Sequence, residues 1–271
     1  MPRKEEDRRF PHILYSCYSR KSSEGEQFIP EHVFGYLISG SSEIYVGGNS
    51  YLFKEGEYRF FRRNQLSRYT KFPPPGGEYR SISIFMDQDT LHEMSEELNL
   101  HASRPYTGEN AFRLSPHPLL TNYIDSITPY LGGINDINKV LTTLKVKEAI
   151  MILLHTHPFL KDLLFDFSEP GKIDLEGYMN EHYKFNVDLS RFAYLTGRSL
   201  ATFKRDFEKI FHTSPKRWLM QRRLKEAYYL IREKGRKTSD VYLEVGFEDF
   251  SHFSYAFKKA FGITPSSVSS I

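Results

Sequence analysis

The 271-residue sequence has very little cysteine: Cys17 stands alone, so no intrachain disulfide can form and a disulfide-stabilised scaffold is excluded. A single thiol of this kind is more often packed than nucleophilic. No run of about 18 apolar residues is present, so no membrane-spanning helix is expected. The first ten residues, MPRKEEDRRF, are charged and contain no apolar stretch of the secretory type, which favours a cytoplasmic protein.

Motifs of the common enzyme classes are missing too. The sequence contains no Walker A loop, no Gly-x-Ser-x-Gly and no paired-carboxylate motif. His155 and His157 form a His-x-His, but they stand at an expected helix end beside Pro158, where a metal site is not expected. We therefore expect a protein that is not an enzyme and that needs no metal and no cofactor.

The net charge of +3 is small, but its distribution is uneven. Between Arg198 and Lys237 the sequence holds 13 basic and 4 acidic residues. A basic block inside a helical region indicates a polyanionic partner. A solvated helix surface is the alternative, and charge alone does not separate the two.

The N-terminal region has the pattern of short β-strands. Over residues 32–64 apolar and polar side chains alternate in brief runs that glycines interrupt. Gly47-Gly48-Asn49 is a strong hairpin signal. Two more strands are expected on either side of the loop Pro73–Gly77, and this spacing predicts a small barrel or sandwich.

Helical patterns follow at residues 87–100, 117–131 and 138–165, the last interrupted near Pro158. The segment from Asn138 to Leu154 carries apolar residues on more than one narrow stripe, among them Leu141 and Leu144. That pattern predicts a helix buried against its own barrel on one side and against a second copy on the other, and hence a homodimer. Residues 166–172, DFSEPGK, contain Pro and Gly without a period, which predicts a linker.

The C-terminal region contains an internal repeat. Three phenylalanines spaced four residues apart occur twice, 50 positions apart, and a Ser-Pro or Thr-Pro pair follows each set. Each copy has the outline of a helix-turn-helix. Phenylalanines at i, i+4 and i+8 share one helix face, and such a face is far more often core than a stacking platform. The two sets are Phe203, Phe207 and Phe211, and Phe253, Phe257 and Phe261.

The segment EVGFEDFSHFSYAFKKAFGITPSS resembles the signature of the AraC/XylS family of transcription regulators. LTGRSLATFKRDFEKIFHTSPKRWLMQRRLKEAYYLI resembles the first repeat of that family, and the match runs from about Ile173 to Ser267. The N-terminal region resembles the family's cupin-like sensor and dimerisation domain. The wording GRSLATFKRDF is similar to the branch that includes type III secretion activators.

The resemblance implies an α+β protein of two domains: a cupin-like β-barrel with helices over residues 1–165, and an all-α domain with two helix-turn-helix motifs over residues 173–271. It implies a sequence-specific DNA-binding transcription regulator, an activator that works with RNA polymerase in the cytoplasm. The second helix of each motif, about residues 199–211 and 249–261, is expected to enter successive major grooves of double-stranded DNA.

The helix surfaces opposite the phenylalanines are expected to meet DNA, because their side chains can bond to base edges and phosphates. Arg205 is the best candidate for reading a guanine, although it can instead pair with Asp206 or Glu208 on the surface. Lys216 and Arg217 lie at a helix start and are expected on phosphate. The full expected set is Arg198, Ser199, Ala201, Thr202, Lys204, Arg205, Lys216, Arg217, Ser251, His252, Ser254, Tyr255 and Lys258.

Three features depart from the family's pattern. His212 stands where the first repeat usually has glycine, at a position expected to be left-handed. Tyr255 replaces an arginine that many members carry, and the sequence ends SSVSSI without the usual Tyr-Arg. The second motif is therefore expected to read bases less sharply than the first and to serve more for positioning.

Two modes of control stay open for the N-terminal domain. A barrel rich in Phe and Tyr suits a small-molecule effector, which is the first hypothesis, although no effector-binding residue is assigned. The same barrel packed with its own side chains suits control by a protein partner. A metal-dependent cupin enzyme is the least favoured interpretation, because His32 stands alone between residues 30 and 85.

Overall fold

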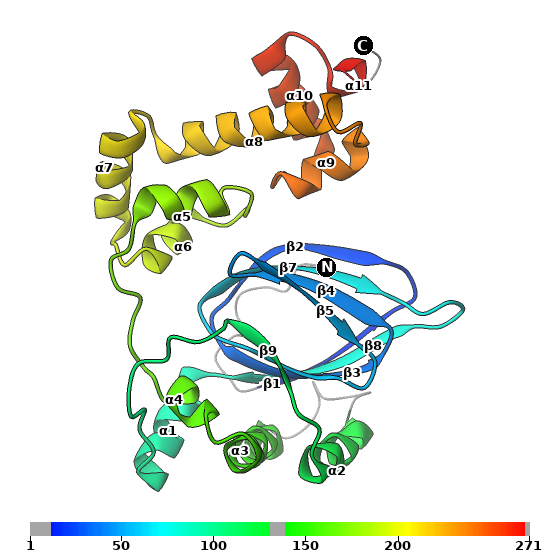
Figure 1. Ribbon diagram of the computed structural model, residues 1–271, viewed down its shortest axis with the longest axis vertical. Coiled ribbons are helices and arrows are strands. Elements are labelled where there is room, and N and C mark those ends of the chain that lie inside the picture. The colour runs from blue at the N-terminus through cyan, green and yellow to red at the C-terminus, as the bar shows by residue number, and fades with distance from the viewer. Residues whose placement is uncertain (1–11, 131–138, 269–271) are drawn as a thin grey trace. The chain divides into compact units, whose positions relative to one another are not determined.

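The computed structural model describes residues 12–130 and 139–268, which form two compact units (Figure 1). Apart from residues 25–28, the first unit ends at Ser168 and the second begins at Glu169. The first unit is built on β-sheets, and the described residues after Ser168 contain helices but no strand, which confirms the α+β fold class. Throughout the described ranges, each helix is too short or too polar to cross a lipid bilayer.

The strands of the first unit form two antiparallel sheets. One sheet has the order β1-β8-β3-β6-β9 and the other the order β2-β7-β4-β5, so that they form an open, cupin-like pair within the described residues. The strands are β1 (His12–Tyr18), β2 (Ser22–Ile29), β3 (His32–Ser39), β4 (Ser41–Val46), β5 (Asn49–Lys54), β6 (Tyr58–Phe61), β7 (Gln65–Phe72), β8 (Tyr79–Met86) and β9 (Ala111–Leu114).

The expected hairpin is confirmed between β4 and β5, where Val46 pairs with Asn49 across a two-residue turn. Both turn residues, Gly47 and Gly48, have positive φ values of 57° and 79°. A two-residue turn of this kind matches the twist of the strands but suits glycine far better than a residue with a Cβ. The strands on either side of the loop Pro73–Gly77 are confirmed as β7 and β8.

The five-stranded sheet is covered on both faces. Its outer face packs on the helices α1 (Gln88–Leu98), α2 (Pro118–Ile127), α3 (Lys139–Thr156) and α4 (Leu160–Leu164), and Figure 1 shows these helices together on that side. Tyr58 and Phe60 of β6 belong to this helical core. Phe61, the next residue along the strand, belongs to a second core that includes Ile44 and Phe53 of the other sheet. Alternate residues of β6 therefore enter different cores, and all four are buried.

The long helical pattern is interrupted as expected. Helix α3 ends at Thr156 and α4 begins at Leu160, with Pro158 between them. The expected start at Asn138 lies outside the described residues. The short 3-10 helix Thr128–Tyr130 follows directly after α2.

The second unit consists of helices in the described residues. They are α5 (Leu175–His182), α6 (Leu189–Leu195), α7 (Leu200–Phe211), α8 (Pro215–Arg232), α9 (Thr238–Glu244), α10 (Phe250–Phe261) and α11 (Pro265–Val268). Helices α6 and α7 form one helix-turn-helix, and α9 and α10 form the other, which confirms the repeat. The long helix α8 joins them in sequence and packs on members of both motifs, α7 in the first and α9 and α10 in the second.

The phenylalanines of the repeat are core residues, as predicted. Phe203, Phe207, Phe253 and Phe257 are completely buried. Helix α8 contributes one aromatic ring to each half of this core. The ring of Trp218 lies 4.6 Å from that of Phe211, and the ring of Tyr228 lies 4.9 Å from that of Phe261.

The expected left-handed residue at the end of α7 is confirmed. His212 has φ 53°, and Gly262 at the matching end of α10 has φ 78°. Each of these residues donates its backbone N–H to a carbonyl one turn earlier, Glu208 in the first motif and Lys258 in the second. The two motifs therefore end their second helices in the same way, even though only one has glycine at that position.

Candidate nucleic-acid interface

The first helix-turn-helix depends on the turn between α6 and α7. Gly197 has φ 65°, and a Cβ at this position would overlap the backbone of Gly171. After the turn, the Ser199 hydroxyl accepts from the backbone N–H of Thr202 at 3.3 Å and so caps α7. Two of the expected interface residues therefore have a local structural task at the start of α7.

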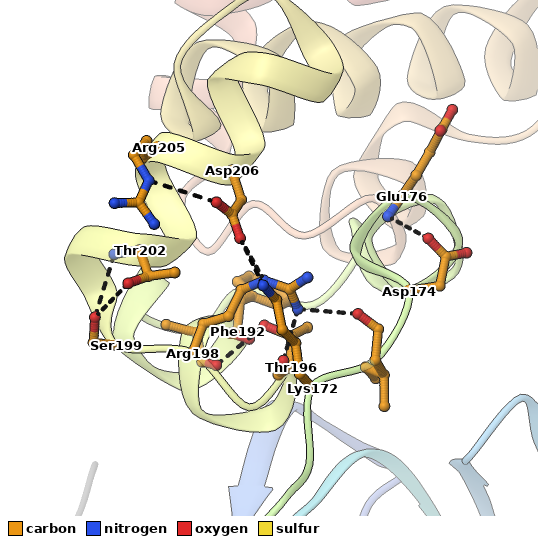
Figure 2. A network of polar contacts seen from close by, with 12 residues as sticks. Lys172, Asp174, Glu176, Phe192, Thr196, Arg198, Ser199, Thr202, Arg205 and Asp206 are labelled. Carbon is orange, nitrogen blue, oxygen red and sulfur yellow. Dashed lines mark hydrogen bonds and ion pairs between the residues drawn. The ribbon is translucent and has the colours of Figure 1, made fainter.

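Arg198 lies at the centre of a network of polar contacts, shown in Figure 2. Its Nε donates to Asp206 Oδ2 at 3.2 Å, and its Nη1 donates to the carbonyl oxygens of Ile173 and Thr196 at 3.0 and 2.7 Å. Lys172 also reaches Asp206, at 3.6 Å. Because Arg198 donates to its carboxylate, the pKa of Asp206 is held below its ordinary value. This network ties the chain that enters the unit to helix α7.

Arg198 differs from the other expected DNA contacts in its burial. Only 7% of its side chain is exposed, and its donors point at the protein. We expected Arg198 to contact DNA, but these contacts favour a structural role for it.

The exposed surface of α7 carries the remaining candidates of the first motif. Ala201, Lys204 and Arg205 are exposed, and Thr202 is half-buried. The Arg205 side chain is 65% exposed, and its Nε lies 3.7 Å from Asp206 Oδ1. The surface pairing considered as the alternative is therefore present, but an exposed pair at this distance contributes little energy and leaves the guanidinium accessible.

The second motif presents a similar surface with different side chains. Its turn contains Gly246, with φ 91°, and Asp249 caps α10 by accepting from the backbone N–H of His252 at 2.6 Å. Tyr255 is 69% exposed, which makes it the most exposed large aromatic residue of the unit's described part. The other candidates on α10 are Ser251, His252 and Lys258, which are exposed, and Ser254, which is half-buried.

Lys216 and Arg217 occupy the first turn of α8. Both are exposed, and Pro215 before them is buried as the first residue of the helix. The backbone N–H groups of a helix start attract anions, and two cationic side chains strengthen that attraction. The start of α8 is therefore suited to a phosphate group.

Arg223 of α8 joins the two motifs. Its Nε donates to the Tyr183 carbonyl at 2.8 Å and its Nη2 to the Phe185 carbonyl at 2.7 Å, both in the connection between α5 and α6. Its Nη1 donates to the Gly246 carbonyl at 2.9 Å, in the turn of the second motif. Because one planar group makes all three bonds, the first motif's support and the second motif's turn are held in a fixed relation.

The sequence offered a signal for Arg223 that our sequence interpretation missed. Arg223 lies four residues after Leu219 and four before Ala227, and both of these are buried. An arginine in the middle of an apolar stripe has to satisfy its donors inside the protein. Its partners are backbone carbonyls far away in the sequence, which no local pattern reveals.

Two family profiles match the chain. The profile described as "Helix-turn-helix domain" matches residues 192–270, and the profile described as "ExsA N-terminal regulatory domain" matches residues 32–163. The virulence regulon transcriptional activator VirF of Yersinia enterocolitica is 31% identical over 241 residues, which are 85% of this chain and 86% of VirF. The transcriptional regulator ExsA of Pseudomonas aeruginosa is 26% identical over 238 residues, 85% of this chain and 83% of ExsA.

Among solved structures, a variant of apo ToxT from Vibrio cholerae matches 95% of this chain and 96% of its own. The TM-score is 0.48 at 11% identity.

Proposed function

The chain belongs to the AraC family of transcription regulators, and from that premise we propose that α7 and α10 enter two successive major-groove segments of double-stranded DNA. The observation that carries this proposal is the division of each helix into a buried phenylalanine face and an exposed polar face. With recognition helices on one rigid unit, the two groove segments lie about one DNA turn apart, roughly 34 Å.

We assign the side chains of the interface to two tasks. Arg205 reads a guanine through O6 and N7, because its planar fork fits that pair of acceptors and its side chain is exposed. Lys204 and Lys258 lie on the same exposed surfaces, and Lys216 and Arg217 contact phosphates. The second motif presents Tyr255 instead of a second arginine and serves more for positioning than for reading.

Arg205→Ala should lower the affinity for the specific site by about 1–3 kcal/mol and relax the preference at one base pair, since a bidentate contact to a base is lost. Lys216→Ala should weaken binding to all duplexes similarly and reduce the salt dependence by about one unit of slope, since one phosphate contact is lost. Binding of the full-length variants to a duplex selected from a random pool and to its scrambled form, over a salt series, measures both effects.

Arg236→Ala is the matched control, because Arg236 belongs to the same basic block but pairs with Glu244 at 2.9 Å at the end of α8. It should change neither the preference nor the slope by much. An equal loss for Arg205→Ala on both duplexes would instead make Arg205 a phosphate contact.

We further propose that the first unit controls DNA binding by binding a small-molecule effector, with a protein partner as the second candidate. The match of residues 32–163 to a regulatory-domain profile supports a regulatory role for this unit. The name of VirF supports activation, and RNA polymerase is then the partner at the promoter. Such a regulator acts in the cytoplasm, where the DNA is.

The proposed homodimer forms through α3. Val140, Leu144 and Met151 are 63%, 58% and 46% exposed and share one face, opposite the face that packs on the sheet. Leu144→Asp should give monomers in sedimentation of the full-length protein, because a charge would be buried at the contact. Leu52→Asp is the matched control, since Leu52 is 47% exposed on β5 and away from this face. A wild-type protein that sediments as a monomer at high concentration, with and without DNA, contradicts the proposal.

A further inference from the structure

An arginine is buried between the two sheets of the first unit. Arg59 of β6 is only 5% exposed. Its Nη1 donates to Ser42 Oγ at 2.7 Å, and its Nη2 lies 3.4 Å from the Tyr79 hydroxyl. Its Nε is buried and has no hydrogen-bond partner. One edge of the guanidinium, formed by Nε and Nη2, is therefore almost unused.

The surrounding chain is shaped to hold this side chain. Arg59 pairs with Gly35 of the neighbouring strand β3, and a Cβ at Gly35 would lie 2.8 Å from Arg59 Nε. The missing side chain at Gly35 thus gives the guanidinium its place on the sheet. The rings of Phe53 and Phe61 each lie 5.9 Å from the guanidinium carbon. Arg59 lies in a cage of aromatic rings and hydroxyl groups.

The charge of Arg59 is not neutralised inside the described part of the protein. No carboxylate of the described residues lies within ion-pair distance, and the residues around it form an apolar core. Burial alone would raise the pKa of Tyr79, but the positive charge of Arg59 outweighs burial and lowers it. A buried cation without a counter-ion costs several kcal/mol, because neither water nor an anion stabilises it.

A second buried arginine shows the ordinary arrangement. Arg63 is 7% exposed, and its Nη2 donates to the carbonyl oxygens of Asp166 and Ser168 at 3.1 and 2.9 Å. Arg63 thus fixes the segment after α4, which is a structural task. The partners of Arg59 are two hydroxyl groups, which hold the guanidinium but leave its fork edge and its charge unmatched.

We propose that Arg59 is the anchor of the effector site, and that the effector is a small organic carboxylate whose two oxygens accept from Nε and Nη2. A carboxylate matches this edge in geometry and in charge. Its carboxylate takes the place of the long Tyr79 contact, and its apolar body packs between Phe53 and Phe61. The inference rests on the proposed control of the chain by a small molecule.

Thermal unfolding of the full-length protein with phenylacetate and hexanoate, each compared with its neutral amide, tests the proposal. The carboxylates should raise the melting temperature of the first unit by about 3–5 °C at about ten times their Kd, and the amides should not. Arg59→Met should abolish this response while its own melting temperature equals or exceeds that of the wild type, because an uncompensated charge is removed. Arg59→Lys, which keeps the charge but not the fork, should respond at least about tenfold more weakly.

Arg63→Met is the matched control: it should lower the melting temperature and keep the carboxylate response. The proposal is overturned if neither carboxylate shifts the wild type, if the amides act equally, if Arg59→Met responds like the wild type, or if Arg59→Met melts lower. DNA binding by ligand-free Arg59→Met separates the two levels. If it still binds the selected duplex while carboxylates have no effect, only this inference fails, whereas a wild type without any sequence preference refutes the proposed function itself.

Discussion

Phe207→Ala and Phe257→Ala should each lower the free energy of unfolding of the helical unit by about 3–5 kcal/mol and abolish DNA binding through that loss of stability. Both side chains are completely buried, and each packs against neighbouring rings of its own helix, Phe207 against Phe211 at 4.3 Å and Phe257 against Phe261 at 4.7 Å. Truncation leaves a cavity that rigid helices cannot fill. Circular dichroism of the full-length variants during thermal and urea unfolding measures the effect.

Phe250→Ala is the matched control on α10. Phe250 is 42% exposed, and its truncation should cost about 1 kcal/mol or less, because little apolar surface returns to water. If Phe207→Ala or Phe257→Ala kept the wild-type stability and lost only affinity for DNA, these phenylalanines would be stacking residues and not core.

Gly246→Ala should destabilise the helical unit even more, by more than about 4 kcal/mol. The backbone at Gly246 has φ 91°, and a Cβ there would overlap the Lys184 carbonyl oxygen and approach the Arg223 guanidinium to 3.1 Å. The substitution therefore combines backbone strain with the displacement of the side chain that joins the two motifs. The unfolding transition of the helical unit and the affinity for the selected duplex should both be lost.

Gly262→Ala separates strain from overlap. Gly262 has φ 78°, but a Cβ at this position meets no atom within 4 Å. It should cost only about 1–2 kcal/mol, the penalty of a left-handed residue with a side chain. Equal effects of the two substitutions would show that the space beside Lys184 and Arg223 does not matter.

The helical unit could be predicted well because its signals are local. The four-residue spacing of Phe203 and Phe207 fixes the buried face of α7, and the repeat after 50 positions gives the second motif. The exposed candidates then follow from the helix period. Arg198 could not be placed in this way, since its partners Ile173 and Asp206 come from the chain before the motif and from the opposite side of the turn.

The sheets of the first unit were predicted only in part. Strands β1, β2 and β9 were not expected, because their pairing is distant in sequence: Ala111 of β9 pairs with Phe61, and Ile13 of β1 with Ile84. The burial of Arg59 escaped notice for a related reason. Alternation in YRFF suggests a polar face in water, whereas a second sheet covers that face.

The three carbonyl bonds of Arg223 set a limit on the DNA that the protein can use. On B-DNA, one inserted base pair moves a half-site by about 3.4 Å and turns it by about 35° around the helix axis. A unit whose two motifs are held by one planar side chain cannot follow that rotation without breaking those bonds. The operator is thus restricted in phase as well as in sequence, and a promoter with the right bases at the wrong helical angle is not a target.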